Sequence, residues 1–218
     1  MPASPHIFLV HGFTRTRHDM WLMARRVRKL LPQSRVHVFG YPSRKLSLRE
    51  SAQHLSSFVT EHAQNENVSF IGHSLGGLLV RALEDVHPEP SQLQRLVTLG
   101  TPHQGSSVAR LLAPNKIFRA IGGPVFHDLA APKLSPTPSF LQVGCVIGHT
   151  NTPIGFIPFL KGDNDGLVSV HEAIFPACQA EVRVPVFHGL FPFSSQATLL
   201  ATRFLEHGTF DKAGRLSS

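Results

Sequence analysis

The residues V-S-F-I-G-H-S-L-G-G at positions 68–77 place one serine between two different local patterns. The β-branched and aromatic run Val68–Ile71 predicts a buried strand. Apolar residues then recur at helical spacing over residues 76–87. A G-x-S-x-G motif between a strand and a helix is typical of a serine nucleophile held on a sharp turn above the edge of a sheet. We therefore predict that Ser74 is the nucleophile of a serine hydrolase.

The two glycines of this motif have a steric role. Gly72 and Gly76 flank the serine at positions where the neighbouring backbone comes too close for a side chain. The helix that follows begins beside the serine, so its free amide hydrogens and its positive dipole end face the site where an oxyanion forms. We expect the Leu75 N–H to be one of the oxyanion donors.

A second oxyanion donor is expected after the first strand of the chain, where V-H-G-F occupies residues 10–13. Gly12 allows the backbone to turn so that the amide of Phe13 faces the serine. Two amides directed at one point are what acyl transfer needs to stabilise its tetrahedral intermediate. We interpret His11 as a structural residue that bonds to neighbouring loops, and not as the catalytic base.

The base should be a histidine in the loop after the last strand, because the chain order in this architecture is serine, acid, histidine. The run E-V-R-V-P-V-F at 181–187 predicts that strand, and His188 follows it directly. His171 precedes the strand and His207 ends the closing helix, so neither is placed to reach the serine. We predict that His188 is the base.

The acid is expected in the loop between the last two strands, where G-D-N-D-G-L-V-S occupies residues 162–169. Asp165 stands directly before a glycine turn and an apolar pair that can anchor it, and is our candidate. Asp163 remains an alternative, although a turn former or a solvated loop residue fits it as well. Asp128 lies in a long insertion, where a helix-capping role fits better.

Working outward from Ser74, strand and helix patterns alternate along the whole chain, which favours an α/β fold with a mainly parallel sheet and helices on both faces. We expect strands at 6–10, 36–39, 68–71, 96–99, 140–147 and 181–187. We expect helices at 20–31, 47–62, 76–87, 108–112, 117–121 and 195–207. At 218 residues, the length predicts a single domain over 1–218, with 101–139 as a candidate cap or lid.

Composition argues against several other classes of protein. The formal net charge is +7, and residues 1–50 hold ten of the 21 Lys and Arg. We interpret Arg25, Arg26, Arg28 and Lys29 as the solvated face of one helix, because no nucleic-acid motif accompanies them. Contact of a membrane with the basic residues of 1–50 stays open but is not predicted.

We expect no metal ion or other cofactor, and no disulfide bond. The two cysteines are 33 residues apart and form no disulfide framework, and the 14 histidines show no metal-ligand spacing. The N-terminus runs into the first strand with no charged-then-apolar leader, so we expect a cytoplasmic protein.

Taken together, the motifs resemble the small lipase/esterase-like bacterial serine hydrolases of the α/β-hydrolase superfamily. The resemblance rests on G-H-S-L-G-G at 72–77, G-T-P-H-Q-G-S at 100–106 and N-D-G-L-V-S-V at 164–170, and extends to H-G-F-T-R-T at 11–16 and G-Y-P-S-R at 40–44. It implies the α/β-hydrolase fold, ester hydrolysis without a cofactor, and a Ser74–Asp165–His188 triad.

The expected substrate is a small ester with an apolar acyl group. Apolar residues of the cap and nearby loops would line its pocket: Phe13, Leu111, Leu112, Ile117, Phe118, Ile121, Val125, Phe126, Phe156, Ile157, Phe159, Leu160, Phe191 and Phe193. An acyltransferase or thioesterase with the same triad is the alternative function. A binding protein on the hydrolase fold is a third candidate, against which the intact set of Ser, Asp and His argues.

Overall fold

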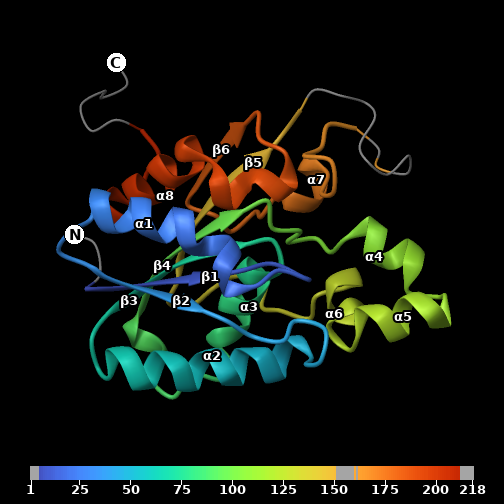
Figure 1. Cartoon of the computed structure of the whole chain (residues 1–218), viewed down its shortest axis with the longest axis horizontal. Coiled ribbons are helices and arrows are strands. Elements are labelled where there is room, and N and C mark those ends of the chain that lie inside the picture. Colours follow the sequence, from blue (N-terminus) through green and yellow to red (C-terminus); the bar gives the residue numbers. More distant parts are fainter. Residues whose placement is uncertain (1–4, 151–159, 161, 212–218) are drawn as a thin grey trace.

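A twisted sheet of six parallel strands runs through the centre of the protein, which a computed structural model describes at residues 5–150, 160 and 162–211 (Figure 1). The strand order is β2-β1-β3-β4-β5-β6. The strands are β1 (His6–Val10), β2 (Arg35–Phe39), β3 (Val68–His73), β4 (Leu93–Leu99), β5 (Gln142–Gly148) and β6 (Ala180–Val184). The order reverses between β1 and β3, so the chain leaves these neighbouring strands in different directions. Ligands of open α/β sheets bind at such a point, beyond the carboxyl ends of the strands.

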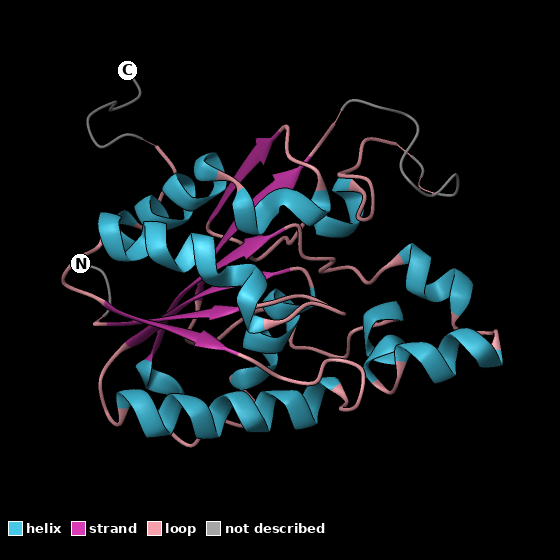
Figure 2. Cartoon of the chain, in the orientation of Figure 1, coloured by secondary structure: helices cyan, strands magenta, loops and turns pink. Residues whose placement is uncertain are grey.

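Helices cover both faces of the sheet, which explains the continuous apolar runs in the central strands. Helices α1 (Trp21–Leu30) and α8 (Ser195–His207) lie on one face, and α2 (Leu48–Ala63) and α3 (Leu75–Leu83) lie on the other (Figures 1 and 2). Side chains alternate between the two faces along each strand. In β1, Phe8 and Val10 pack towards α2 and α3, whereas Ile7 and Leu9 pack towards α1 and α8.

The predicted fold class is confirmed, and several boundaries shift for local reasons. The fifth strand begins at Gln142 and not at Phe140, because the backbone amides of residues 139–141 donate to the Glu84 carboxylate. The last strand ends at Val184, where the Val186 amide turns back to donate to the Val184 carbonyl. That residues 1–218 form one domain stays a prediction.

The candidate cap consists of three short helices beyond the carboxyl ends of the strands (Figure 1). They are α4 (Ser107–Leu112), α5 (Lys116–Gly122) and α6 (Val125–Ala130). The first two were predicted, and α6 was missed, as was α7 (Val170–Ala173). Single turns η1 (Arg17–Met20), η2 (Pro90–Gln92) and η3 (His188–Phe193) complete the elements.

Asp128 ties this cap to the main body. Its carboxylate accepts a hydrogen bond of 2.8 Å from the amide of Leu48, the first residue of α2. Next to it, Ser47 and Glu50 form the reciprocal pair of bonds that their spacing suggests. Asp128 therefore has the helix-capping role expected of it, on a helix 80 residues away in the chain.

Within the described part of the chain, no helix combines the length and the apolar character needed to cross a bilayer.

Candidate active site

Ser74 occupies a strained turn between β3 and α3. Its backbone angles are φ 54° and ψ −121°, a conformation that residues with a side chain seldom adopt. A β-carbon on Gly76 would lie 2.3 Å from the carbonyl oxygen of Val10, and one on Gly72 would lie 2.6 Å from the amide nitrogen of Gly77. The predicted need for glycine on both sides of the serine is therefore confirmed.

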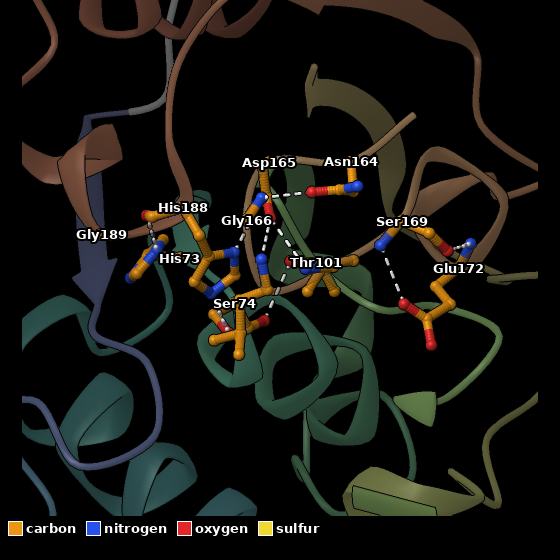
Figure 3. Close-up of polar contacts among 12 residues, drawn as sticks. His73, Ser74, Thr101, Asn164, Asp165, Gly166, Ser169, Glu172, His188 and Gly189 are labelled. Atoms are coloured by element: carbon orange, nitrogen blue, oxygen red, sulfur yellow. Dashed lines mark hydrogen bonds and ion pairs between the residues drawn. The ribbon is translucent and has the colours of Figure 1, made fainter. Parts of the chain in front are cut away.

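Bonds from β4 and its following loop hold this turn in place. The Ser74 amide donates to the carbonyl of Leu99 at 2.9 Å, and the Thr101 hydroxyl donates to the Ser74 carbonyl at 2.9 Å (Figure 3). Thr101 was not identified from the sequence as a residue of the site. Thr101 lies inside the G-T-P-H-Q-G-S segment that carries the family resemblance, so the sequence did mark this region. Its partner Ser74 is 27 residues away in the chain, and the sequence does not show this contact.

The structure brings Ser74, His188 and Asp165 together in one hydrogen-bonded chain. His188 Nε2 lies 3.0 Å from Ser74 Oγ, and His188 Nδ1 lies 2.8 Å from Asp165 Oδ2 (Figure 3). An ionised carboxylate only accepts hydrogen bonds, so Nδ1 carries the proton and Nε2 accepts from the serine hydroxyl. All three residues are buried, which shields this chain of bonds from competing water.

The loop after β5 fixes Asp165 through both of its carboxylate oxygens. One oxygen faces His188, and the other accepts from the amides of Leu167 at 3.1 Å and Val168 at 2.8 Å. The Asp165 carbonyl also accepts from the His188 amide at 2.8 Å. Gly166 makes the tight turn possible with a φ of +96°.

The alternative acids and bases lie elsewhere. The Asp163 carboxylate is 3.7 Å from His149 Nδ1 and does not contact His188. His171 lies exposed on α7, and His207 lies at the end of α8 beside Glu206. Of the candidates weighed, His188 is the histidine that bonds to Ser74, and Asp165 is the carboxylate that bonds to His188.

The two expected oxyanion donors lie on segments that meet at Ser74. Leu75 is the first residue of α3, so its amide has no acceptor within the helix. A β-carbon on Gly12, the residue before Phe13, would lie only 3.0 Å from the Ser74 β-carbon. The backbone at Phe13 is therefore beside the nucleophile, as a donor there requires.

His11 has the structural role predicted for it. Its Nδ1 bonds to the Gly12 carbonyl at 2.9 Å, its Nε2 accepts from the Tyr41 amide at 3.3 Å, and its ring stacks on the Tyr41 ring. Both ring nitrogens are thus engaged by neighbouring loops. Burial lowers the pKa of His11, which keeps it neutral.

His73, inside the serine motif, supports the base and was not identified from the sequence. Its Nε2 donates to the carbonyl of His188 at 3.0 Å (Figure 3). Its ring lies 5.0 Å from the His188 ring. Burial holds the pKa of His73 well below the ordinary value, so the ring is a neutral support.

Two cavities open beside the serine. An apolar cavity of about 280 Å³ lies under the cap and includes five of the residues expected there: Phe13, Leu112, Phe118, Ile121 and Phe126. A second cavity of about 320 Å³ reaches Ser74 and His188 from the other side, past Arg15, Leu167 and Phe187.

The other residues expected in the acyl pocket have different locations. Leu111, Ile117 and Phe193 are exposed, whereas Val125, Leu160 and Phe191 are buried. Leu111, Ile117 and Val125 are outside the apolar cavity because each short cap helix turns only one side towards the site. Phe156, Ile157 and Phe159 lie outside the described residues.

No group of three or more His, Cys, Asp or Glu side chains suited to a metal ion occurs in the described ranges. That the protein needs no cofactor stays a prediction.

Comparison with known proteins identifies a family. The sequence profile described as palmitoyl protein thioesterase matches residues 6–137, which include the turn at Ser74 and the three cap helices. Among curated proteins, none matches the sequence.

Solved structures agree on the fold. The mature form of the lipase BlEst2 from Bacillus licheniformis superposes with a TM-score of 0.73 at 20% identity, over 94% of each chain. The product of gene lin2722 from Listeria innocua gives a TM-score of 0.62 at 15% identity, again over 94% of each chain. A putative hydrolase of the α/β superfamily from Xanthomonas campestris gives 0.56 at 14% identity, over 92% of this chain and 95% of its own. The resemblance to small bacterial lipases and esterases with the α/β-hydrolase fold is therefore confirmed.

Buried neutral histidines make stability depend on pH. Burial lowers the pKa of His11, His73 and His103 from the ordinary value of 6.5. Below pH 6.5 the unfolded chain binds protons on these residues and the native chain does not, so acid favours unfolding. The free energy of unfolding should fall by up to about 1.4 kcal/mol per pH unit for each such histidine. Urea unfolding at pH 7.5, 6.5 and 5.5 measures this slope.

His73→Asn should reduce this slope, because the variant lacks one of the buried histidines whose pKa is lowered in the native chain. Equal stability of the unaltered protein at pH 7.5 and 5.5 would contradict this account.

Proposed function

The chain belongs to the palmitoyl protein thioesterase family, and from this we propose that it hydrolyses carboxylic esters or thioesters through Ser74, His188 and Asp165. The observation that carries the proposal is the hydrogen-bonded chain from Asp165 through His188 to the hydroxyl of a serine held on a strained strand–helix turn. An acyl group is transferred to Ser74 and then to water.

In the first step, Ser74 Oγ attacks the acyl carbon while His188 Nε2 takes the hydroxyl proton. The carbonyl oxygen gains the negative charge, and the amides of Phe13 and Leu75 stabilise it. The imidazolium that forms is stabilised by Asp165, which stays ionised. The bond to the leaving alcohol or thiol then breaks, and the proton on Nε2 goes to that group.

In the second step, water replaces the leaving group. His188 removes its proton, the hydroxide attacks the acyl carbon, and collapse of the intermediate restores the Ser74 hydroxyl and releases the acid. The tautomer required at each stage is the one that the bond between His188 Nδ1 and Asp165 favours.

The residues that line the two cavities support a division of the substrate between them. The apolar cavity under the cap suits an acyl chain, and each methylene buried there contributes about 0.8 kcal/mol. The cavity past Arg15 and His188 suits the alcohol or thiol part, because protonation of the leaving group occurs at His188.

Of the two substrate classes in this proposal, the family match favours thioesters. Transfer of the acyl group to an acceptor other than water uses the same first step. The cytoplasmic location and the small-molecule ester substrate remain predictions.

A fluorophosphonate probe tests the nucleophile. The probe should label Ser74 covalently, and Ser74→Ala should abolish labelling and lower kcat by about 10⁴–10⁶ on p-nitrophenyl esters and acyl thioesters. Mass spectrometry of the labelled peptide and steady-state kinetics provide the two measurements. Labelling that persists in Ser74→Ala, with both substrates still turned over, would refute the assignment.

The two aspartates of the loop after β5 give a matched pair. Asp165→Asn should lower kcat by about 10⁴, because the amide no longer holds His188 in the tautomer that accepts the serine proton. Asp163→Asn should cost less than about tenfold, because Asp163 lies beside His149 and not beside His188. Circular dichroism checks that both variants are folded, and exchanged phenotypes would make Asp163 the acid.

The size of the acyl cavity is open to a direct test. Val108 lines the cavity and Leu111, on the same helix, is exposed. Val108→Phe should lower kcat/KM for octanoyl esters about tenfold more than for acetyl esters, because the larger ring takes up room for the chain. Leu111→Phe is the control and should change both equally. An unchanged chain-length profile for Val108→Phe would show that the acyl group binds elsewhere.

A further inference from the structure

A third cavity, of about 520 Å³, adjoins the two at Ser74 and has a different character. Its polar lining includes Thr14, Arg15, Ser43, Arg44 and Lys45. The first four of these residues belong to the motifs H-G-F-T-R-T at 11–16 and G-Y-P-S-R at 40–44, and Lys45 directly follows the second motif. The proposed hydrolysis uses only the first motif, as the loop of an oxyanion donor. The question is what a basic cavity does at this place.

The three cavities meet at one residue. Thr14 lines all of them, Arg15 also lines the cavity at His188, and Ile121 also lines the apolar cavity. The basic cavity is therefore adjacent to the cavity at His188, with Thr14 and Arg15 lining both, and lies next to the place where the leaving group of a substrate at Ser74 would be.

The charges facing this cavity leave it net positive. Arg44 and Lys45 are exposed, and across the described residues neither forms an ion pair. Arg15 is partly engaged, with one nitrogen 3.0 Å from Asp19 and another donating to the Gly189 carbonyl at 3.1 Å. Asp19 pairs with Arg15, and the described residues that line the cavity include no Asp or Glu.

The loop that carries these cations is held in shape. Ser43 Oγ accepts from the Thr14 amide at 3.1 Å, and the Lys45 amide donates to the Pro42 carbonyl at 2.8 Å. On the other side, a β-carbon on Gly123 would lie 1.7 Å from the Arg44 carbonyl oxygen, so the cap backbone packs directly on the loop. Figure 1 shows this loop, between β2 and α2, reaching the cap helices.

We propose that this cavity binds a phosphate group carried by the leaving group of the substrate. The inference rests on the proposed hydrolysis and narrows its substrate class to esters or thioesters whose alcohol or thiol part is phosphorylated. A guanidinium, an ammonium and a serine hydroxyl on one rigid loop form a donor set suited to phosphate oxygens. The phosphate could belong to a glycerophospholipid headgroup or to a coenzyme A thiol, which present the same chemistry here.

Two pairs of soluble substrates separate these sources. In each pair the acyl group is butyryl, and one member has a phosphate-containing leaving group whereas the other has a neutral one. Butyryl-coenzyme A is compared with butyryl-N-acetylcysteamine, and dibutyryl glycerophosphocholine with dibutyrylglycerol. The unaltered protein should show at least about a tenfold higher kcat/KM for the phosphorylated member of one pair. The pair that shows this preference identifies which of the two molecules carries the phosphate. Equal values within both pairs would overturn the inference.

The double variant Arg44→Gln/Lys45→Gln tests the cavity itself. It should lower kcat/KM for the phosphorylated member about tenfold more than for its neutral partner. The matched control Lys29→Gln/Arg49→Gln removes two exposed charges outside the cavity and should preserve the preference. If both double variants reduce the preference equally, the effect comes from net charge and the proposed subsite is wrong.

A binding measurement separates this inference from the proposed hydrolysis. Calorimetry on Ser74→Ala, with free coenzyme A and with glycerophosphocholine, should detect binding of one of them that the Arg44/Lys45 variant weakens about tenfold. Hydrolysis of neutral esters without such binding overturns the subsite alone. Failure of fluorophosphonate labelling and of all turnover overturns both proposals.

Discussion

The contact of Gly76 with the end of β1 is the constraint on which the site depends. A β-carbon at position 76 would lie 2.3 Å from the Val10 carbonyl oxygen and 2.8 Å from that of His11. Because β1 and β3 are neighbouring parallel strands, this approach sets the N-terminus of α3 against the loop after β1. The amides of Leu75 and Phe13 therefore come from two separate segments to the same serine. The strained backbone at Ser74 costs about 1–3 kcal/mol, which bonds to Leu99 and Thr101 help to offset.

The three residues of the hydrogen-bonded chain were predictable because they follow from topology. In a parallel sheet, loops after different strands meet at one edge, so a serine after β3, an aspartate after β5 and a histidine after β6 converge whatever their sequence separation. Thr101 and His73 were not predictable in the same way. Each donates to a backbone carbonyl, Thr101 to that of Ser74 and His73 to that of His188. Because every residue has a backbone carbonyl, the residue type of the acceptor does not indicate such a bond.

The same distinction explains which parts of the fold could be predicted from the sequence. Long periodic helices such as α2 and α8 are determined by local pattern and were found with bounds close to those observed. Helix α6 has six residues, too few to show a period, and it is stabilised by burial of Val125, Phe126 and Leu129. The start of β5 depends on Glu84, which takes the amides of residues 139–141 from 55 or more residues away. Such tertiary contacts override local preference and are not visible in a short window of sequence.

If the basic cavity binds the leaving group as proposed, the bond from Thr14 to Ser43 would join that binding to the proposed oxyanion donor at Phe13. Thr14 has a positive φ of 57°, an unfavourable conformation for a β-branched residue, and its amide donates to Ser43 Oγ. That hydroxyl keeps its own proton, which can bond to an anion in the basic cavity. An occupied cavity would then restrain Ser43, and through it the peptide next to Phe13. Contacts far from the acyl carbon would thereby contribute to stabilising the transition state, since binding energy from a non-reacting part of a substrate can hold the donors in position. A leaving group without an anion makes no such contact, so its loss would lower kcat as well as raise KM.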